Sequence, residues 1–343
     1  MNTTLYLSRT TCTAVEASFF LDKAIKCSSL SLGKLPSAIG LPHNLSPLTM
    51  YRLQTIAALS AIPIEICSVP ESDDPFVFWL NEHQQTSKLP QGLTDWHAHT
   101  QFAYCSRGID LCSAIELSQT WGVETQCFSE HAFALYFPSN ALKFYWQSDR
   151  AFVERIWETS LRGRMKLYRD LIAPLRIQYG KRIQFGLEVD LFANGNFCLA
   201  QEDQDGWDYL IGAIHEVEGI DPRTASNAEL EKAWFRDVER LTTFPISILA
   251  HPFRYFPWYH REVPRHLYRS VARLLAQRKI AAEINHHQNP FELEFFRICL
   301  EEGVRLSLGT DAHITRNIAD LHPHLQTLTD LGLTARSSSL LNA

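Results

Sequence analysis

The sequence predicts an α/β barrel of seven parallel strands that follows a small N-terminal α+β appendage. From residue 93 onward, short apolar runs alternate with stretches of helical periodicity. This alternation is typical of parallel strands joined by right-handed crossover helices. Histidines and acids stand at or just beyond the ends of several apolar runs. Because the strands of a barrel end at one rim, we expect these side chains to converge there.

Each predicted element follows from a local pattern. The strands are predicted at residues 94–100, 123–129, 183–191, 209–215, 246–251, 280–285 and 304–310, and helices at 110–121, 150–179, 263–277 and 291–302. Gly122 is a stop signal for the first helix, and we expect the second to be interrupted near Pro174. Ser226, with Glu229 three residues later, has the capping-box pattern of a helix start. Seven strands predict a barrel smaller than the usual eight.

Residues 1–88 differ from the rest of the chain. They contain apolar stretches such as 53–66 but no cluster of ligand-type side chains. Residues 68–75 form a turn or loop pattern, and residues 87–92 resemble a linker. We therefore divide the chain into an N-terminal appendage of unknown role, 1–88, and a barrel domain, 93–343.

The bulk properties are those of a globular protein. The chain has 343 residues, is 45% hydrophobic and carries a formal net charge of −6, which argues against a general binder of nucleic acid. There is no apolar run of about twenty residues, so no membrane span is expected. The start of the sequence lacks a signal-peptide pattern, and the eight cysteines form no Cys-x-x-Cys pair. These features predict reduced thiols and a cytoplasmic location.

The side chains at the strand ends have the chemistry of metal ligands. His97 and His99 are two residues apart on one strand, so both imidazoles point to the same face. Asp311 and His313 repeat this spacing near the last strand. A central Glu188 could bridge two metal ions through its two oxygens. The remaining candidates are His131, His215 and His251.

A structural role is the alternative for each of these residues taken singly, because a lone histidine at a strand end is often only hydrogen-bonded. The recurrence of such residues at successive strand ends favours a metal site. Buried histidines and acids without partners would be costly in the absence of a compensating ion.

The order of the motifs resembles the polymerase and histidinol phosphatase (PHP) superfamily of metallohydrolases. The resemblance covers about residues 93–315. It rests on His97-Ala98-His99-Thr100, Ser129-Glu130-His131, Gly186-Leu187-Glu188-Val189-Asp190, Gly212 to His215, Ala250-His251-Pro252, Glu283-Ile284-Asn285 and Thr310-Asp311-Ala312-His313. The long spacer between His131 and Glu188 is most similar to the histidinol-phosphatase branch. The resemblance implies a distorted seven-stranded barrel with two or three Zn, Mn or Fe ions at its C-terminal rim.

The same resemblance implies a ligand set for each ion. The first ion would be held by His97, His99, Glu188 and Asp311, the second by Glu188, His215 and His251, and a third by His131 and His313. The sequence departs from the family at Cys105, where the phosphatases often have another histidine. A thiolate can bind zinc, but Cys105 could equally be a small apolar residue. The sequence therefore leaves open whether a third ion binds and which molecule is the substrate.

This ligand set predicts a hydrolytic mechanism. Two ions about 3.5–4 Å apart can share a water and lower its pKa towards neutrality. The resulting hydroxide would attack phosphorus while the ions neutralise the phosphoryl oxygens. Glu188, Asp311 and His215 are the predicted catalytic residues. Asp95 and Glu130 stand beside ligands and could orient imidazoles, or they could be ordinary strand-end acids.

Three arginines are candidates for binding a phosphate. Arg107, Arg254 and Arg316 each follow a ligand motif, and an arginine can bind phosphate oxygens through two parallel hydrogen bonds. Residues 253–269 mix aromatic and basic side chains and could cover the substrate. Such a mixture can also bind single-stranded nucleic acid, but the acidic balance of the chain opposes this. The basic run 150–182 is interpreted as a solvated helix face.

The predicted function is a metal-dependent phosphomonoesterase that acts on a small phosphorylated molecule, with histidinol phosphate as the guess from the resemblance. One alternative is a phosphodiesterase or 3′-5′ exonuclease of the same superfamily, which would shorten labelled DNA. Another is a non-catalytic binding module that keeps a metal for stability, with residues 1–88 recruiting a partner. Bound metal without turnover would favour that module. The sequence does not predict an oligomeric state.

Overall fold

The computed structural model describes residues 89–106, 109, 111–137, 150–155, 157, 162–287, 292–314 and 317–342, together with three short strands at 4–6, 38–41 and 64–66. Two compact units emerge, one of Met1–Leu89 with Cys112–Gly122 and one of Pro90–Leu111 with Val123–Ala343. The first unit contains a parallel sheet of β1 (Thr4–Tyr6), β2 (Ala38–Leu41) and β3 (Ile64–Ile66), and helix α4 (Leu111–Trp121). The division into 1–88 and 93–343 stays a prediction.

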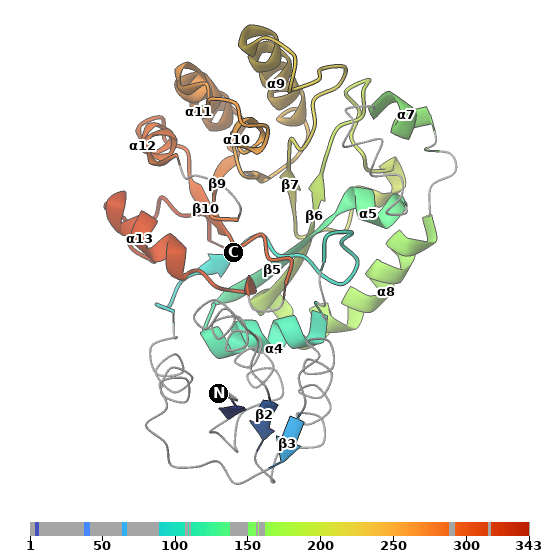
Figure 1. Cartoon of the computed structure of the whole chain (residues 1–343), viewed down its shortest axis with the longest axis vertical. Helices are drawn as coiled ribbons and strands as arrows, with labels where there is room; N and C mark the ends of the chain where they lie inside the picture. The colour runs from blue at the N-terminus through green and yellow to red at the C-terminus, as the bar shows by residue number, and fades with distance from the viewer. Residues whose placement is uncertain are drawn as a thin grey trace. The chain divides into compact units, whose positions relative to one another are not determined.

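The second unit is built on seven parallel strands, which confirms the predicted barrel (Figure 1). The strands are β4 (Thr94–Asp95), β5 (Thr125–His131), β6 (Ile183–Val189), β7 (Tyr209–Gly212), β8 (Ile248–Leu249), β9 (Ala281–Asn285) and β10 (Leu306–Gly309), hydrogen-bonded in that order. Each corresponds to a predicted strand. Beyond β4 and β10 the backbone also pairs: Trp96 N–H donates to Leu308 O at 2.8 Å and Asp311 N–H to His97 O at 2.6 Å. These bonds bring the first and last strands together, so that the barrel is nearly closed.

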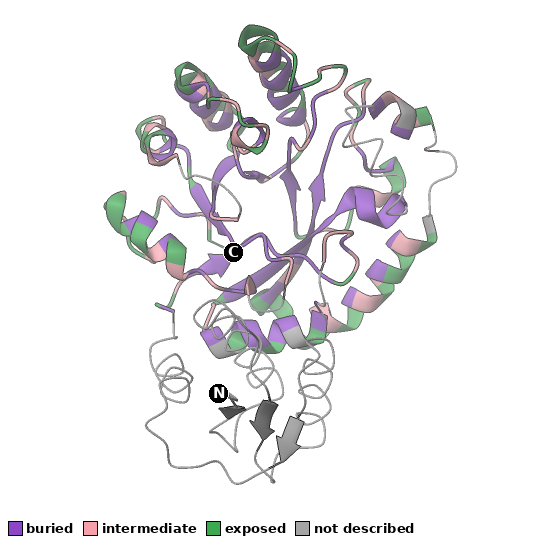
Figure 2. Ribbon diagram, viewed as in Figure 1, coloured by how far each residue is buried: buried purple, intermediate pink, exposed green. Residues whose placement is uncertain are grey.

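The strands are buried on both faces, because one face fills the barrel and the other is covered by helices. All seven residues of β5 and all five of β9 are buried. Figure 2 shows the strands of this unit almost entirely buried, whereas the surrounding helices bury one side and expose the other. The strand sequences therefore lack a simple alternation, and their apolar runs are the expected signature of a parallel sheet.

The helices of this unit are α5 (Ala132–Tyr136), α7 (Arg150–Arg155), α8 (Arg162–Tyr179), α9 (Asn227–Leu241), α10 (Tyr255–Trp258), α11 (Tyr268–Arg278), α12 (Leu293–Glu301) and α13 (His322–Asp330). The predicted capping box is confirmed, since the Ser226 side chain accepts from Glu229 N–H and the Glu229 carboxylate accepts from Ser226 N–H. No described helix has the length and apolar character needed to cross a membrane.

The expected interruption near Pro174 is wrong, because α8 runs through this residue without a break. A proline inside a helix removes one backbone hydrogen bond, to the carbonyl four residues earlier. That carbonyl belongs to Asp170, and both Asp170 and Pro174 are exposed. Water can therefore satisfy the carbonyl that the proline leaves without an N–H donor.

Candidate metal centre

The eight predicted ligand side chains lie at the carboxyl ends of the strands, at one rim of the barrel. His97 and His99 follow β4, His131 ends β5, Glu188 lies near the end of β6, His215 follows β7, His251 follows β8, and Asp311 and His313 follow β10. The register pairs His131 directly with Glu188. Seven of the eight fall into groups whose potential ligand atoms lie within 4.8 Å of one another: His97, His99 and Glu188; His131, Glu188 and His215; His99, His131 and His313; and His287, Asp311 and His313.

Glu188 lies at the centre of this cluster and is fully buried. Its Oε2 is 2.7 Å from His131 Nδ1 and 3.5 Å from His97 Nε2. Its Oε1 is 3.0 Å from His251 Nε2 and 3.5 Å from His215 Nε2. The two oxygens of one carboxylate thus face two different sets of imidazoles, as required for a carboxylate that bridges two ions.

Several buried atoms of the cluster have no hydrogen-bond partner within the described part of the chain. They are His97 Nε2 and His99 Nδ1, together with His131 Nδ1 and Glu188 Oε2, whose 2.7 Å approach lacks hydrogen-bond geometry. A buried polar atom without a partner costs about 1–3 kcal/mol. A divalent cation binds imidazole nitrogen and carboxylate oxygen, so the residues present fit a metal ion.

The electrostatics of the cluster also favour a cation. Although burial opposes it, the surrounding carboxylates, Glu283 first, hold the pKa of His97 well above its usual range. A hydrogen bond to Asp311, together with the nearby Glu130 carboxylate, raises the pKa of His99 to about 9 against the same opposition. A cavity that stabilises protonated imidazoles has a negative potential, and a divalent cation would respond to that potential as a proton does.

Two other imidazoles of the cluster show the opposite shift of pKa. Burial, followed by the nearby Arg254, lowers the pKa of His251 to about 3. Burial likewise lowers the pKa of His313 to about 2. These imidazoles are neutral at physiological pH, which is the form that binds metals.

Two further carboxylates contact histidines of the cluster. Glu283 Oε1 is 2.7 Å from His97 Nδ1, and Asp190 Oδ1 is 2.7 Å from His215 Nδ1. In both imidazoles Nδ1–H donates to the carboxylate, which leaves Nε2 without a proton and within 3.5 Å of Glu188. The sequence analysis gave neither acid this role, although both lie in the quoted motifs.

Asp95 and Glu130, the two acids that could orient imidazoles according to the sequence, have different contacts. Glu130 Oε1 is 3.6 Å from His99 Nδ1, and its Oε2 accepts from Thr100 N–H at 3.1 Å. Asp95 accepts instead from Gln126 Nε2 at 3.0 Å and Thr310 Oγ1 at 2.8 Å, and its described contacts include no imidazole side chain. Burial raises the pKa of Asp95 to about 6. The hydrogen bonds of Asp95 therefore connect the end of β4 with the start of β5 and with the residue that follows β10.

Asp311 faces the cluster with one oxygen only. Its Oδ1 is 3.0 Å from His99 Nε2, whereas its Oδ2 accepts from Arg254 Nη1 and from Asn285 Nδ2. The backbone of Asp311 has φ +50° and that of His251 has φ +29°. Non-glycine residues rarely adopt such angles, and strain of this kind is concentrated at functional sites.

Of the three arginines predicted to bind substrate, only Arg254 lies within the described residues. Its guanidinium contacts Asp311 and lies 3.5 Å from His215 Nε2. Its side chain is 13% exposed. Arg107 and Arg316 lie outside the described residues.

The region of the expected third ion contains a stack of imidazoles. Ring centroids are 4.2 Å apart for His131 and His99, 4.5 Å for His99 and His313, and 4.7 Å for His313 and His287. Cys105 Sγ lies 3.3 Å from His131 Nε2. His287 was not among the predicted ligands, although it lies two residues beyond the end of β9, close to a strand end as the predicted ligands are.

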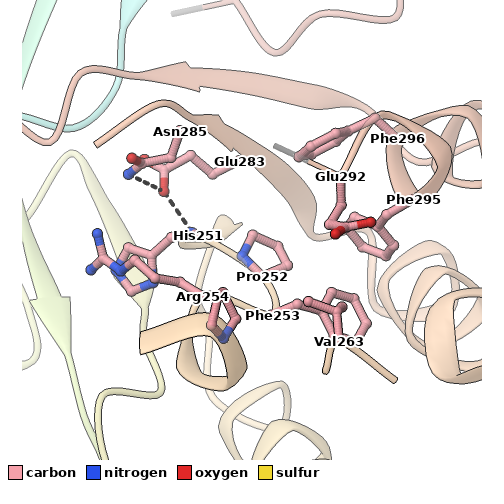
Figure 3. A pocket seen from close by; sticks show the side chains of 11 residues that line it. His251, Pro252, Phe253, Arg254, Val263, Glu283, Asn285, Glu292, Phe295 and Phe296 are labelled. Carbon is pink, nitrogen blue, oxygen red and sulfur yellow. Dashed lines mark hydrogen bonds between the residues drawn. The ribbon is translucent and has the colours of Figure 1, made fainter. Parts of the chain in front are cut away.

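A small cavity of about 30 Å³ opens beside the cluster. His251, Arg254, Glu283 and Asn285 line it on the side of the metal-facing residues, and Glu292 and Phe295 on the other (Figure 3). Its volume is about that of one water molecule.

A seven-stranded parallel barrel with histidines and acids gathered at its carboxyl rim is an arrangement that could hold metal ions. The family model of the PHP domain matches residues 95–287, more than half of the chain. The chain therefore belongs to the PHP domain family, and it is a metal-dependent hydrolase of that superfamily.

The other comparisons are more distant. No curated protein matches the chain. Among solved structures, the crystal structure of the "putative histidinol phosphatase hisK from Listeria monocytogenes" is 16% identical, with a TM-score of 0.35, and the match covers 67% of this chain and 99% of that chain.

Proposed function

We propose that the chain is a phosphomonoesterase that hydrolyses a small phosphorylated molecule, in a reaction similar to that of histidinol phosphatase. The observation that supports this most is the position of Glu188, whose two oxygens face separate groups of imidazoles at 3.0–3.5 Å and 2.7–3.8 Å. We propose a cytoplasmic location, which the free thiols of Cys105, Cys127 and Cys299 support.

The ligand sets that we propose are those of the sequence analysis. His97, His99, Glu188 and Asp311 would hold one ion, Glu188, His215 and His251 a second, and His131 and His313 a third, with Zn, Mn or Fe as the candidates. The ions would supply a water of lowered pKa and neutralise charge on the phosphoryl oxygens. Asp190 and Glu283 hold the imidazoles of His215 and His97 in the orientation that presents Nε2.

We assign Arg254 to the phosphoryl group. Its guanidinium lies at the rim beside Asp311 and His215. Two parallel N–H donors match two phosphoryl oxygens, and the partial exposure of the side chain leaves it accessible from the rim. The chain has a formal net charge of −6, which would not attract a long polyanion. A small anionic substrate is compatible with this charge.

The test of this function is the release of inorganic phosphate from a panel of phosphomonoesters, histidinol phosphate included, with added Mn²⁺ or Zn²⁺. We expect metal-dependent turnover of at least one member, abolished by a chelator. Cleavage of a phosphodiester or shortening of labelled DNA, without phosphomonoester turnover, would replace the proposal with the nuclease alternative. Bound metal with no turnover on either panel would favour the binding module.

The variant Arg254→Lys tests the role of the arginine. Lysine keeps the charge but cannot form two parallel hydrogen bonds. We expect kcat/KM to fall about ten- to hundredfold, the effect of losing a hydrogen bond to a charged group, while bound metal is retained. An unchanged kcat/KM on the best substrate would remove Arg254 from the substrate site. Arg240→Lys, on the surface of α9, is the matched control and should have no effect.

A further inference from the structure

We propose that Glu283 is a positioning residue that couples the two halves of the metal centre, and that position 309 must be glycine to leave room for its carboxylate. This inference rests on the metal centre of the proposed function. It concerns the binding of metal and is independent of the substrate.

Glu283 contacts residues on both sides of the centre. It lies on β9 and is fully buried. Its Oε1 is 2.7 Å from His97 Nδ1, and its Oε2 accepts from the backbone N–H of His251 at 2.7 Å (Figure 3). In the proposed arrangement His97 and His251 hold different ions. A single carboxylate thus fixes the position of one ligand from each set.

A neighbouring amide extends this contact to a third ligand. Asn285 is two residues further along β9, so its side chain points to the same face as that of Glu283. Its Nδ2 donates to Glu283 Oε2 at 3.1 Å and to Asp311 Oδ2 at 3.3 Å. Glu283 and Asn285 therefore connect ligands that follow three different strands, β4, β8 and β10.

The two hydrogen bonds of Glu283 have different consequences. The bond to His97 fixes the proton on Nδ1 and makes Nε2 a better ligand, as carboxylates commonly do for metal-binding histidines. The bond to His251 holds the backbone at a residue whose φ is +29°. A strained conformation persists only where its surroundings enforce it, and the buried carboxylate is one such constraint.

Gly309 provides the space that Glu283 occupies. It lies on β10 and pairs with Asn285 in the β9–β10 register. A Cβ added at Gly309 would lie 1.9 Å from Glu283 Oε1 and 2.8 Å from His97 Cβ. The backbone of Gly309 is not left-handed, so alanine there would act through space alone. Gly309→Ala should therefore displace the Glu283 carboxylate from His97 and press on the His97 side chain as well, although it replaces no proposed ligand.

The experiment compares Glu283→Gln and Gly309→Ala with the wild type and with Gly163→Ala. Gly163 lies on the exposed face of α8, and a Cβ there meets no atom within 4 Å, so it is the matched glycine control. Metal affinity is measured by competition with a chelator, using Zn²⁺ alone, and bound metal per chain by elemental analysis. Circular dichroism establishes that each variant is folded.

We expect Glu283→Gln and Gly309→Ala each to weaken Zn²⁺ binding about ten- to hundredfold, with Gly163→Ala unchanged. Glutamine has one acceptor oxygen in place of two, so it cannot serve both His97 and His251. Asp190 approaches His215 alone of the proposed ligands. Asp190→Asn is therefore expected to weaken the binding of one Zn²⁺ ion, whereas Glu283→Gln is expected to weaken the binding of two.

The double variant Glu283→Gln with Gly309→Ala tests whether the two changes act through the same contact or cause two unrelated defects. If Gly309→Ala acts through Glu283, combining it with Glu283→Gln should add little to the loss caused by either change. Additive losses would contradict the link between the two residues. Wild-type affinity in both folded single variants would overturn the inference while leaving the proposed function intact. A wild-type protein that binds no Zn²⁺ would instead overturn the proposed function.

Discussion

Glu188→Gln is expected to lower the turnover of the best phosphomonoester by about a thousandfold, the upper range for removal of one electrostatic contact in an active site. The carboxylate faces both groups of imidazoles, so its charge attracts both proposed ions. Glutamine has nearly the same shape but is neutral, and only one of its two terminal atoms can bind a metal. The loss should appear in kcat more than in KM.

The matched control is Glu292→Gln. Glu292 lines the small cavity beside the cluster, accepts from the Tyr268 hydroxyl at 2.6 Å and is not among the proposed ligands. Steady-state kinetics at saturating Mn²⁺ give the comparison, and bound metal is measured on the same samples. A Glu188→Gln enzyme that keeps more than a tenth of wild-type turnover with both ions bound would contradict a bridging role.

Removal of the metal is the second large effect. In its absence the fully buried Glu188 and Asp311 face imidazoles across an enclosed space, and His97 Nε2, His99 Nδ1 and Glu188 Oε2 have no hydrogen-bond partner among the described residues. A ligand present at a thousand times its Kd stabilises a folded protein by about 4 kcal/mol. We therefore expect dialysis against a chelator to abolish phosphatase activity and to lower Tm by about 8–16 °C, at roughly 2–4 °C per kcal/mol.

Re-addition of Zn²⁺ or Mn²⁺ should restore both Tm and activity. Ca²⁺ provides the comparison, because it prefers six to eight oxygen ligands and this site is rich in nitrogen. Differential scanning calorimetry with and without each ion gives the measurement. An equal Tm before and after chelation would show that no tightly bound ion contributes to the folded state.

Much of the barrel could be predicted because parallel strands are marked by apolar runs, and the ligands follow those runs directly. His97, His215 and His251 each lie within a few residues of a strand end, so topology alone predicts that they meet. The central position of Glu188 within the cluster also followed from the order of the strands, since β6 lies near the middle of the sheet.

Other features depend on side-chain directions that a sequence does not reveal. Glu283 and Asp190 orient histidines from other strands, and these contacts are set by the stagger between strands and by rotamers. Asp95 stands two residues before His97 but contacts backbone and side chains of β5 and β10 instead of an imidazole. Helix α8 can continue through Pro174 because the residue that loses a backbone hydrogen bond, Asp170, is exposed to water. This exposure follows from how the helix packs and cannot be predicted from the sequence.

The central claim is that divalent ions bind on both sides of Glu188. Anomalous diffraction from crystals grown with Zn²⁺, recorded above and below the zinc edge, tests it most directly. The account predicts at least two peaks beside the Glu188 carboxylate, about 3.5–4 Å apart, one near His97 and His99 and one near His215 and His251. Crystals of the folded chain with no peak within reach of these side chains would contradict it.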